Sequence, residues 1–278
     1  MRKAMPVFLL TTTIAAWLML VPAVGAAQSR TIESAVLFLA DDAREGRGVG
    51  TAGLDAAAGY IADEFRRIGL APPANGYYQR FELDPSAPAL AHAELGAAAV
   101  TNVVGILPGR GLFAEQTMII GAHYDHLGYG GSGSLDPDST GVVHNGADDN
   151  ASGTAALLRT AELLSALEAA DRRTVVFIAF TAEELGLLGS DYYTKHPARP
   201  LETTVAMINF DMVGRLRQDR LIAIGTGSAA QLPALPSQAA PDAPTAPPAA
   251  APELPPALPP ALPTQPEQAA PSPMEQVR

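Results

Sequence analysis

The sequence predicts an α/β sandwich, in which helices flank a central sheet that is mostly parallel or mixed. Two observations lead to this prediction. Strand-like and helix-like stretches alternate from about residue 29 to residue 228, an order that places helices on both faces of a sheet. The run 174–180 is apolar almost throughout, as expected for a strand that is buried on both faces.

The individual elements are predicted from the spacing of apolar residues. In the second helix, Ile61, Phe65 and Ile68 lie on one face. The strand predicted at 204–210 is, like 174–180, expected to be buried. The helices are predicted at 31–40, 52–68, 152–167 and 185–193, and the strands at 77–83, 100–107, 117–122, 174–180, 204–210 and, more weakly, 221–224.

Composition excludes several classes of protein. The chain has 278 residues, a formal net charge of -11 and 47% hydrophobic residues, which is enough apolar material for a sizeable core. Its acidic balance argues against a nucleic-acid partner, which would require a basic face. Because the chain has no cysteine, it has neither disulfides nor thiolate metal sites. A tightly bound transition metal would therefore be held by His, Asp and Glu.

The N-terminus has the three parts of a signal peptide, predicted at residues 1–27. Arg2 and Lys3 precede an apolar run from about Val7 to Val21, and small residues follow at 24–27. The alternative is a membrane anchor, but the run is short for a span, which takes roughly 20 apolar residues. We expect cleavage after Ala26 or Ala27 and export to the periplasm or the extracellular space, with no stable membrane span in the mature chain.

The mature chain is expected to divide into a globular domain, residues 29–228, and a tail, residues 231–278. The tail is mostly proline and alanine. Proline at this density sustains neither a helix nor a central strand. The tail is therefore predicted to be disordered or polyproline-like.

Four short segments within the globular domain carry acidic residues or histidine where a buried strand ends or a helix begins. Ligands of open α/β sheets bind outside the carboxyl ends of the strands, so the four segments are expected to meet at one rim. Single charges at strand ends are commonly solvated, but four such segments with a histidine among them favour a metal site. The segments are residues 121–126, 145–153, 181–184 and 209–212.

The residue types in these segments suit zinc, which takes three or four nitrogen and oxygen ligands. Glu183 can take a proton from an attacking water, and Asp125 can orient a ligating imidazole. Two zinc ions about 3.5–4 Å apart would need a carboxylate between them, for which Asp148 and Asp149 compete. The candidate ligands are His123, Asp149, Glu184 and Asp211.

These segments resemble the co-catalytic zinc aminopeptidases, a family that includes bacterial leucyl aminopeptidase and has glutamate carboxypeptidase and the non-catalytic transferrin receptor as relatives. The resemblance covers roughly residues 32–227. It implies a three-layer zinc exopeptidase-like fold, one or two bound zinc ions and peptides as substrates, from which N-terminal residues are removed. The motifs are His123-x-Asp125, the run 146–153, the pair Glu183–Glu184 and the run 209–212.

The resemblance also implies how the metals are held. His123 and Asp211 would bind one zinc, and Glu184 would bind the other. Asp149 would bridge the two ions. Its peptide bond to Asn150 would be cis, which is rare for a residue other than proline.

The remaining roles follow from the same resemblance. Glu183 would be the general base and acid, and Asp125 would orient the histidine ligand. Asp148 would not be a ligand, because Asp149 matches the bridging position of the family.

The chain departs from the family after Asp211. The family completes its second zinc site with a histidine well downstream of that position, but none follows in this sequence. We therefore expect a truncated domain without its last strands and helices, a weakly occupied second site and impaired turnover. His126 and His144 could replace the absent ligand, although their spacing does not require it. The five histidines are His92, His123, His126, His144 and His196.

Two alternatives to an aminopeptidase stay open. A truncated peptidase-like domain could bind a metal or a partner without turnover. A carboxypeptidase or another amidohydrolase could use the same set of metal ligands.

Overall fold

The computed structural model describes residues 31–86, 90, 98–131, 133–136, 139, 141–215 and 221–225. The predicted signal peptide (1–27), the predicted tail (231–278) and His92 lie outside the described residues. All described helices and strands belong to one compact unit, residues 1–221. The described residues 221–225 form no strand, so the strand predicted at 221–224 is wrong. No helix within the described ranges is both long and apolar enough to cross a membrane.

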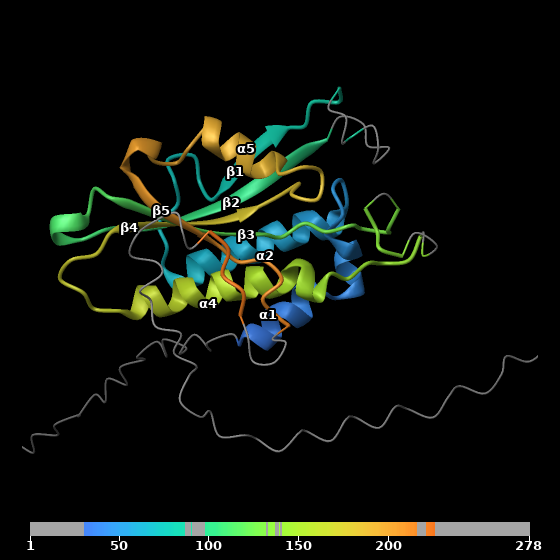
Figure 1. The fold of residues 1–278 in the computed structure, drawn as a ribbon, viewed down its shortest axis with the longest axis horizontal. Helices are drawn as coiled ribbons and strands as arrows, with labels where there is room; N and C mark the ends of the chain where they lie inside the picture. Colours follow the sequence, from blue (N-terminus) through green and yellow to red (C-terminus); the bar gives the residue numbers. More distant parts are fainter. Residues whose placement is uncertain are drawn as a thin grey trace, which may run out of the picture. The chain divides into compact units, whose positions relative to one another are not determined.

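A five-stranded mixed sheet forms the centre of the unit (Figure 1). Its spatial order is β1-β2-β4-β3-β5. Strand β3 is parallel to both β4 and β5, whereas β2 is antiparallel to β1 and β4. The strands are β1 (Tyr78–Glu82), β2 (Ala99–Leu107), β3 (Thr117–His123), β4 (Thr174–Phe180) and β5 (Thr204–Asn209).

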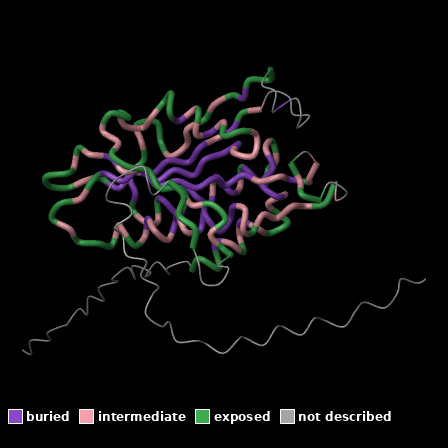
Figure 2. The backbone as a smooth tube through the Cα atoms, viewed as in Figure 1, coloured by how far each residue is buried: buried purple, intermediate pink, exposed green. Residues whose placement is uncertain are grey.

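Helices cover both faces of the sheet, as the packing of successive β4 side chains on opposite faces shows. Val175, Phe177 and Ala179 pack in the core cluster that also contains residues of α1, α2 and α4. Their neighbours Val176 and Ile178 pack on the other face, with Tyr193 of α5. The predicted three-layer α/β sandwich is therefore confirmed, and the buried strands run through its middle (Figure 2). The helices are α1 (Ile32–Leu39), α2 (Ala52–Ile68), α4 (Gly153–Ala166) and α5 (Leu188–Lys195).

Helix α2 matches its predicted bounds because its sequence carries both end signals. The hydroxyl of Thr51 accepts a hydrogen bond from the Leu54 N–H and caps the first turn. Gly69 ends the helix in the left-handed conformation, with φ of 87°. The apolar face between these caps is buried against the sheet.

Strand β5 corrects one prediction. It lies at the edge of the described sheet and pairs with β3 alone. Val205, Met207 and Ile208 are 53%, 51% and 43% exposed. The expectation that this strand is buried like β4 is therefore wrong, because an apolar run does not distinguish an edge strand from a central one.

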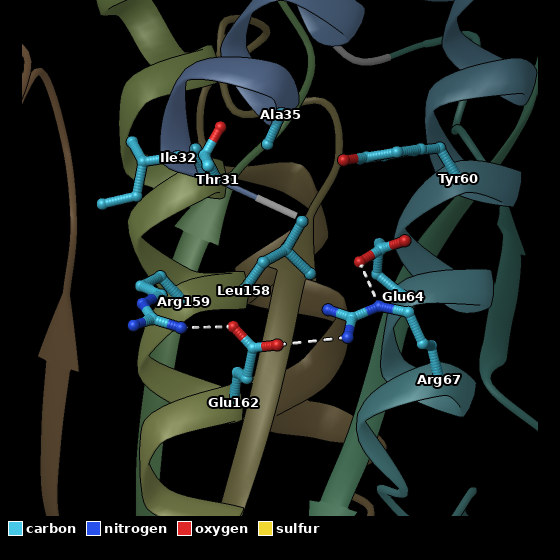
Figure 3. Close-up of a pocket in the computed structure, with 10 residues that line it drawn as sticks. Thr31, Ile32, Ala35, Tyr60, Glu64, Arg67, Leu158, Arg159 and Glu162 are labelled. Atoms are coloured by element: carbon cyan, nitrogen blue, oxygen red, sulfur yellow. Dashed lines mark hydrogen bonds and ion pairs between the residues drawn. The ribbon is translucent and has the colours of Figure 1, made fainter. Parts of the chain in front are cut away.

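A small hollow between α1, α2 and α4 is lined by charged side chains that pair with one another (Figure 3). Arg67 of α2 contacts Glu64 at 2.9 Å and Glu162 of α4 at 3.1 Å. Arg159 also pairs with Glu162. These ion pairs join α2 to α4, and none of the candidate ligands lines this hollow.

Candidate metal centre

The sheet topology brings the four predicted segments together. Because β3 runs parallel to β4 and β5, the three strands end at the same edge. The register pairs His123 with Phe180 and Gly121 with Asn209, so the residues that follow these strands leave the sheet side by side. The segment with Asp149 reaches the same edge from the turn Ala147–Ser152, which precedes α4. The predicted convergence at one rim is confirmed.

His123 is the centre of a first cluster of donors. Its Nε2 atom lies 3.3 Å from Oδ1 of Asp149 and 3.5 Å from Oδ1 of Asp211. Zinc bonds of about 2.0–2.1 Å in a tetrahedral arrangement separate two ligand atoms by about 3.3–3.4 Å. The two distances from His123 are therefore close to those of zinc ligands, and the three donor atoms lie within 4.8 Å of one another.

The charges of this cluster show why a cation belongs there. The ring of His123 is only 2% exposed. Burial alone would lower its pKa, but the neighbouring Asp125, Asp149 and Asp211 raise the pKa of His123 to about 12. In turn, contact with His123 lowers the pKa of Asp149. Without a metal, a proton on the imidazole supplies the positive charge that these carboxylates require.

Asp149, and not its neighbour Asp148, faces the cluster. Asp148 turns to the opposite side, where it pairs with Arg215 at 3.1 Å and accepts a hydrogen bond from the Gly214 N–H. The peptide bond from Asp149 to Asn150 is cis, as the resemblance implies. Asp149 contributes to two of the three donor clusters found among the described residues. This placement suits a bridging carboxylate.

Glu183 and Glu184 follow β4, and with His123 they form another of the donor clusters found among the described residues. Glu183 places Oε2 3.8 Å from Nε2 of His123. Burial raises the pKa of Glu183, and the nearby carboxylates of Asp125, Glu184 and Asp211 raise it further. A carboxylate that has a raised pKa and lies beside a group of metal-donor side chains is suited to act as a general base.

Asp125 lies beside His123, but its hydrogen bonds go elsewhere. Its Oδ1 is 3.7 Å from Nδ1 of His123, longer than a hydrogen bond. The two carboxylate oxygens instead accept the backbone N–H groups of Glu183 at 3.1 Å and of Glu184 at 3.3 Å. Asp125 therefore holds the turn that carries the glutamates, a role that sequence reasoning missed.

His126 belongs to a second cluster of donors, whereas its spacing in the sequence did not require it to be a ligand. Its Nδ1 lies 2.7 Å from Oε1 of Glu184. With Asp149, these residues offer three ligand atoms within 4.8 Å of one another. His144 takes no part, since its Nε2 lies 3.2 Å from the carbonyl oxygen of Ser139. His196 stacks on Tyr192 at the end of α5.

Two buried polar side chains fix the loops of the site and were not predicted. The guanidinium of Arg47 is fully buried and donates to four backbone carbonyls, including those of Tyr124 and Gly146. Asn150 donates to the carbonyl of Phe210 and accepts the Met212 N–H, so it links the Asp149 turn to the Asp211 segment. A lone arginine far from the motifs gives no sequence signal for such a role. For Asn150 the sequence does give a signal, because this residue directly follows Asp149.

A pocket of about 190 Å³ opens beside the donors. Glu183 and His123 are among the residues that line it. Its walls also include the apolar side chains Phe180, Leu187 and Met207. The site thus combines metal donors, a carboxylate with a raised pKa and a partly apolar recess.

Fold and donor set define an α/β protein with a metal site at the carboxyl edge of its sheet. Residues 102–247, a little over half of the chain, match the model of peptidase family M28. The chain belongs to this family. The match begins in β2 and includes every candidate ligand.

Named relatives agree with this assignment. "Aminopeptidase YwaD" of Bacillus subtilis is 33% identical over 114 residues, which are 41% of this chain and 22% of that protein. A Zn-dependent exopeptidase from Parabacteroides distasonis has a TM-score of 0.51 at 25% identity, over 66% of this chain and 62% of that one. The chain thus spans less than two thirds of the length of either protein.

The same fold is also found in a solved structure that carries a different enzyme name. A glutaminyl cyclase from Porphyromonas gingivalis has a TM-score of 0.52 at 23% identity, over 66% of this chain and 62% of that one. At this identity the likeness concerns the fold alone. A choice between chemistries must therefore rest on the site.

Proposed function

We propose that this chain is an exported, zinc-dependent metallo-exopeptidase that removes N-terminal residues from peptides. One observation carries the proposal. The carboxylate of Glu183 stands 3.8 Å from the metal-facing nitrogen of His123, beside two donor clusters that share Asp149. A general base next to a two-metal donor set is an arrangement that suits peptide hydrolysis.

Each residue of the site has a separate proposed role in hydrolysis. Bound zinc would supply Lewis acidity toward the scissile carbonyl and make water easier to deprotonate. Glu183 takes a proton from the attacking water and returns it to the leaving amine. Asp125, through the Glu183 N–H, keeps this carboxylate aimed at the reacting atoms. His123, Asp149 and Asp211 would hold one ion, and Asp149 and Glu184 would contribute to a second.

The pocket beside Glu183 is proposed to accept the side chain of the residue that is removed. Phe180, Leu187 and Met207 give it apolar walls, and about 190 Å³ is enough for one medium-sized side chain. The free amine of the substrate would meet the exposed carboxylates at the mouth of the site. This arrangement favours apolar N-terminal residues such as leucine.

A further part of the proposal concerns the cell. Export rests on the N-terminal pattern of residues 1–27.

The test is an assay of the zinc-loaded mature chain on four substrates. These are leucyl anilide, the same anilide with a blocked amine, a peptide read at its C-terminus, and a peptide that begins with glutamine. We expect chelator-sensitive release from the free-amine anilide alone. Cleavage of the blocked or C-terminal substrate would indicate another hydrolase, cyclisation of the glutamine peptide would indicate a cyclase, and zinc binding without turnover would indicate a binding domain.

A further inference from the structure

We infer that His126 is the third protein ligand of the second metal, together with Asp149 and Glu184. The inference rests on the proposed function, because it concerns the same metal centre. It revises the expectation that this ion has only two protein ligands. Three protein ligands and an open position are the usual complement of a catalytic zinc.

The position of the His126 ring is the first argument. Its Nδ1 contacts Oε1 of Glu184 at 2.7 Å, and a carboxylate oxygen of Asp149 completes a triangle of atoms within 4.8 Å of one another. These three atoms are the donors that a bound zinc ion would share.

The surroundings of the ring are the second argument. Gly146 has φ of 56°, and a Cβ atom there would lie 2.5 Å from Cδ2 and 2.6 Å from Cγ of His126. Only glycine leaves room for the imidazole in this place. The backbone N–H of His126 donates to the carbonyl oxygen of Arg47 at 3.2 Å, whose own side chain donates to Gly146. The ring is therefore held beside the Asp149 turn by contacts that do not depend on Glu184.

The alternative is that His126 is only a hydrogen-bond partner that orients Glu184. An orienting role would require one nitrogen of His126 near Glu184, but it would not require a carboxylate oxygen of Asp149 nearby. Because both carboxylates lie near the ring, the geometry favours His126 as a metal ligand. The two roles differ in how many zinc ions the chain binds tightly.

The experiment is a zinc titration of the metal-free full chain, followed by calorimetry and by elemental analysis after dialysis. The parent chain should bind two zinc ions. His126→Ala should retain the first ion and bind the second at least about 100-fold more weakly, beyond the upper end of the effect of losing an outer-shell partner. His144→Ala, which removes a histidine outside the clusters, should bind both ions like the parent.

Two further variants separate this inference from loss of the fold and from failure of the proposed function. Glu184→Gln should lose the same ion, and His126→Ala combined with Glu184→Gln should lose no more. If His126→Ala or His126→Gln is folded by circular dichroism and still binds two ions as tightly as the parent, the inference is wrong. Zinc content does not depend on turnover, so an inactive chain that binds two ions and loses the second with His126→Ala would overturn the peptidase proposal and support this site.

Discussion

The carboxylate of Asp125 accepts the backbone N–H of Glu183 at 3.1 Å. This bond joins the segment after β3, which carries His123, to the turn after β4, which carries the general base. The distance between the metal donors and Glu183 is therefore fixed by a residue that contacts neither the metal nor the substrate. Changes at Asp125 should affect the whole site rather than one ligand.

Replacing Asp125 should destabilise the fold and weaken metal binding together. Asp125 is fully buried, so Asp125→Ala leaves two N–H groups without an acceptor, at a cost of about 1–3 kcal/mol each. Zinc affinity should fall about 10–100-fold. Thermal unfolding and zinc titration measure both effects. Asp191→Ala, which removes an exposed ion pair with Lys195, should change neither, and an unchanged Asp125→Ala would contradict the role.

Asp149→Ala should lower the zinc content more than any other single replacement, because the carboxylate belongs to both clusters. Elemental analysis of the dialysed protein gives the zinc content directly. Asp148→Ala is the matched control, since Asp148 faces Arg215 instead. Equal zinc in Asp149→Ala and the parent would show that the metal assignment is mistaken.

Glu183→Gln should keep the metal and the fold and lose most of the turnover. Glutamine has the shape of glutamate but does not accept a proton, and general-base catalysis is worth about 10²–10⁴-fold. The measurement is kcat with zinc content determined on the same sample. Activity near that of the parent in a fully metallated variant would exclude this role.

Zinc binding should release a proton at the first site. The neighbouring carboxylates outweigh burial and raise the pKa of His123 to about 12 in the metal-free chain, so the imidazole is charged at pH 7.5, whereas zinc requires it neutral. Apparent zinc affinity should therefore rise about tenfold per pH unit below that pKa, provided that one proton leaves. Calorimetry in buffers of different ionisation enthalpy counts the protons. A count of zero would mean that His123 is neutral before zinc binds.

Strand β5, at the edge of the described sheet, should promote self-association. Val205 is 53% exposed on β5, and unpaired strand edges with apolar side chains are templates for aggregation. Val205→Lys should lower the concentration-dependent light scattering of the chain. Leu163→Lys removes a side chain that is 51% exposed on α4 and should have little effect. Equal scattering by Val205→Lys and the parent would show that β5 is not the contact.

Much of the fold follows from local patterns, as α2 and β4 illustrate. Both match their predicted bounds, α2 through its capping residues and β4 through an unbroken run of buried residues. The position of β5 at the sheet edge could not be predicted in the same way. The burial of an apolar strand depends on which segments pair beside it, and this is a property of the tertiary structure.

The candidate site, like the fold, is predictable from the sequence only in part. The convergence of His123, Asp149 and Glu184 is predictable, because the topology of α/β sheets gathers strand ends at one edge. The contact between His126 and Glu184 is not, since it depends on the path of the chain after β3 and on the space left by Gly146. Sequence reasoning identifies which residues can be ligands, and packing determines which of them meet.

The buried guanidinium of Arg47 connects regions that are distant in the chain. It donates to Leu39, at the end of α1, and to Asn145 and Gly146, about a hundred residues later. None of these carbonyls can be exposed to solvent without breaking a bond to the same side chain. The amides around α1 and those around the Asp149 turn should therefore exchange with deuterium as one cooperative unit. A proteolytic cut or a destabilising substitution near α1 should therefore also speed the deuterium exchange of the amides in the turn that carries Asp149.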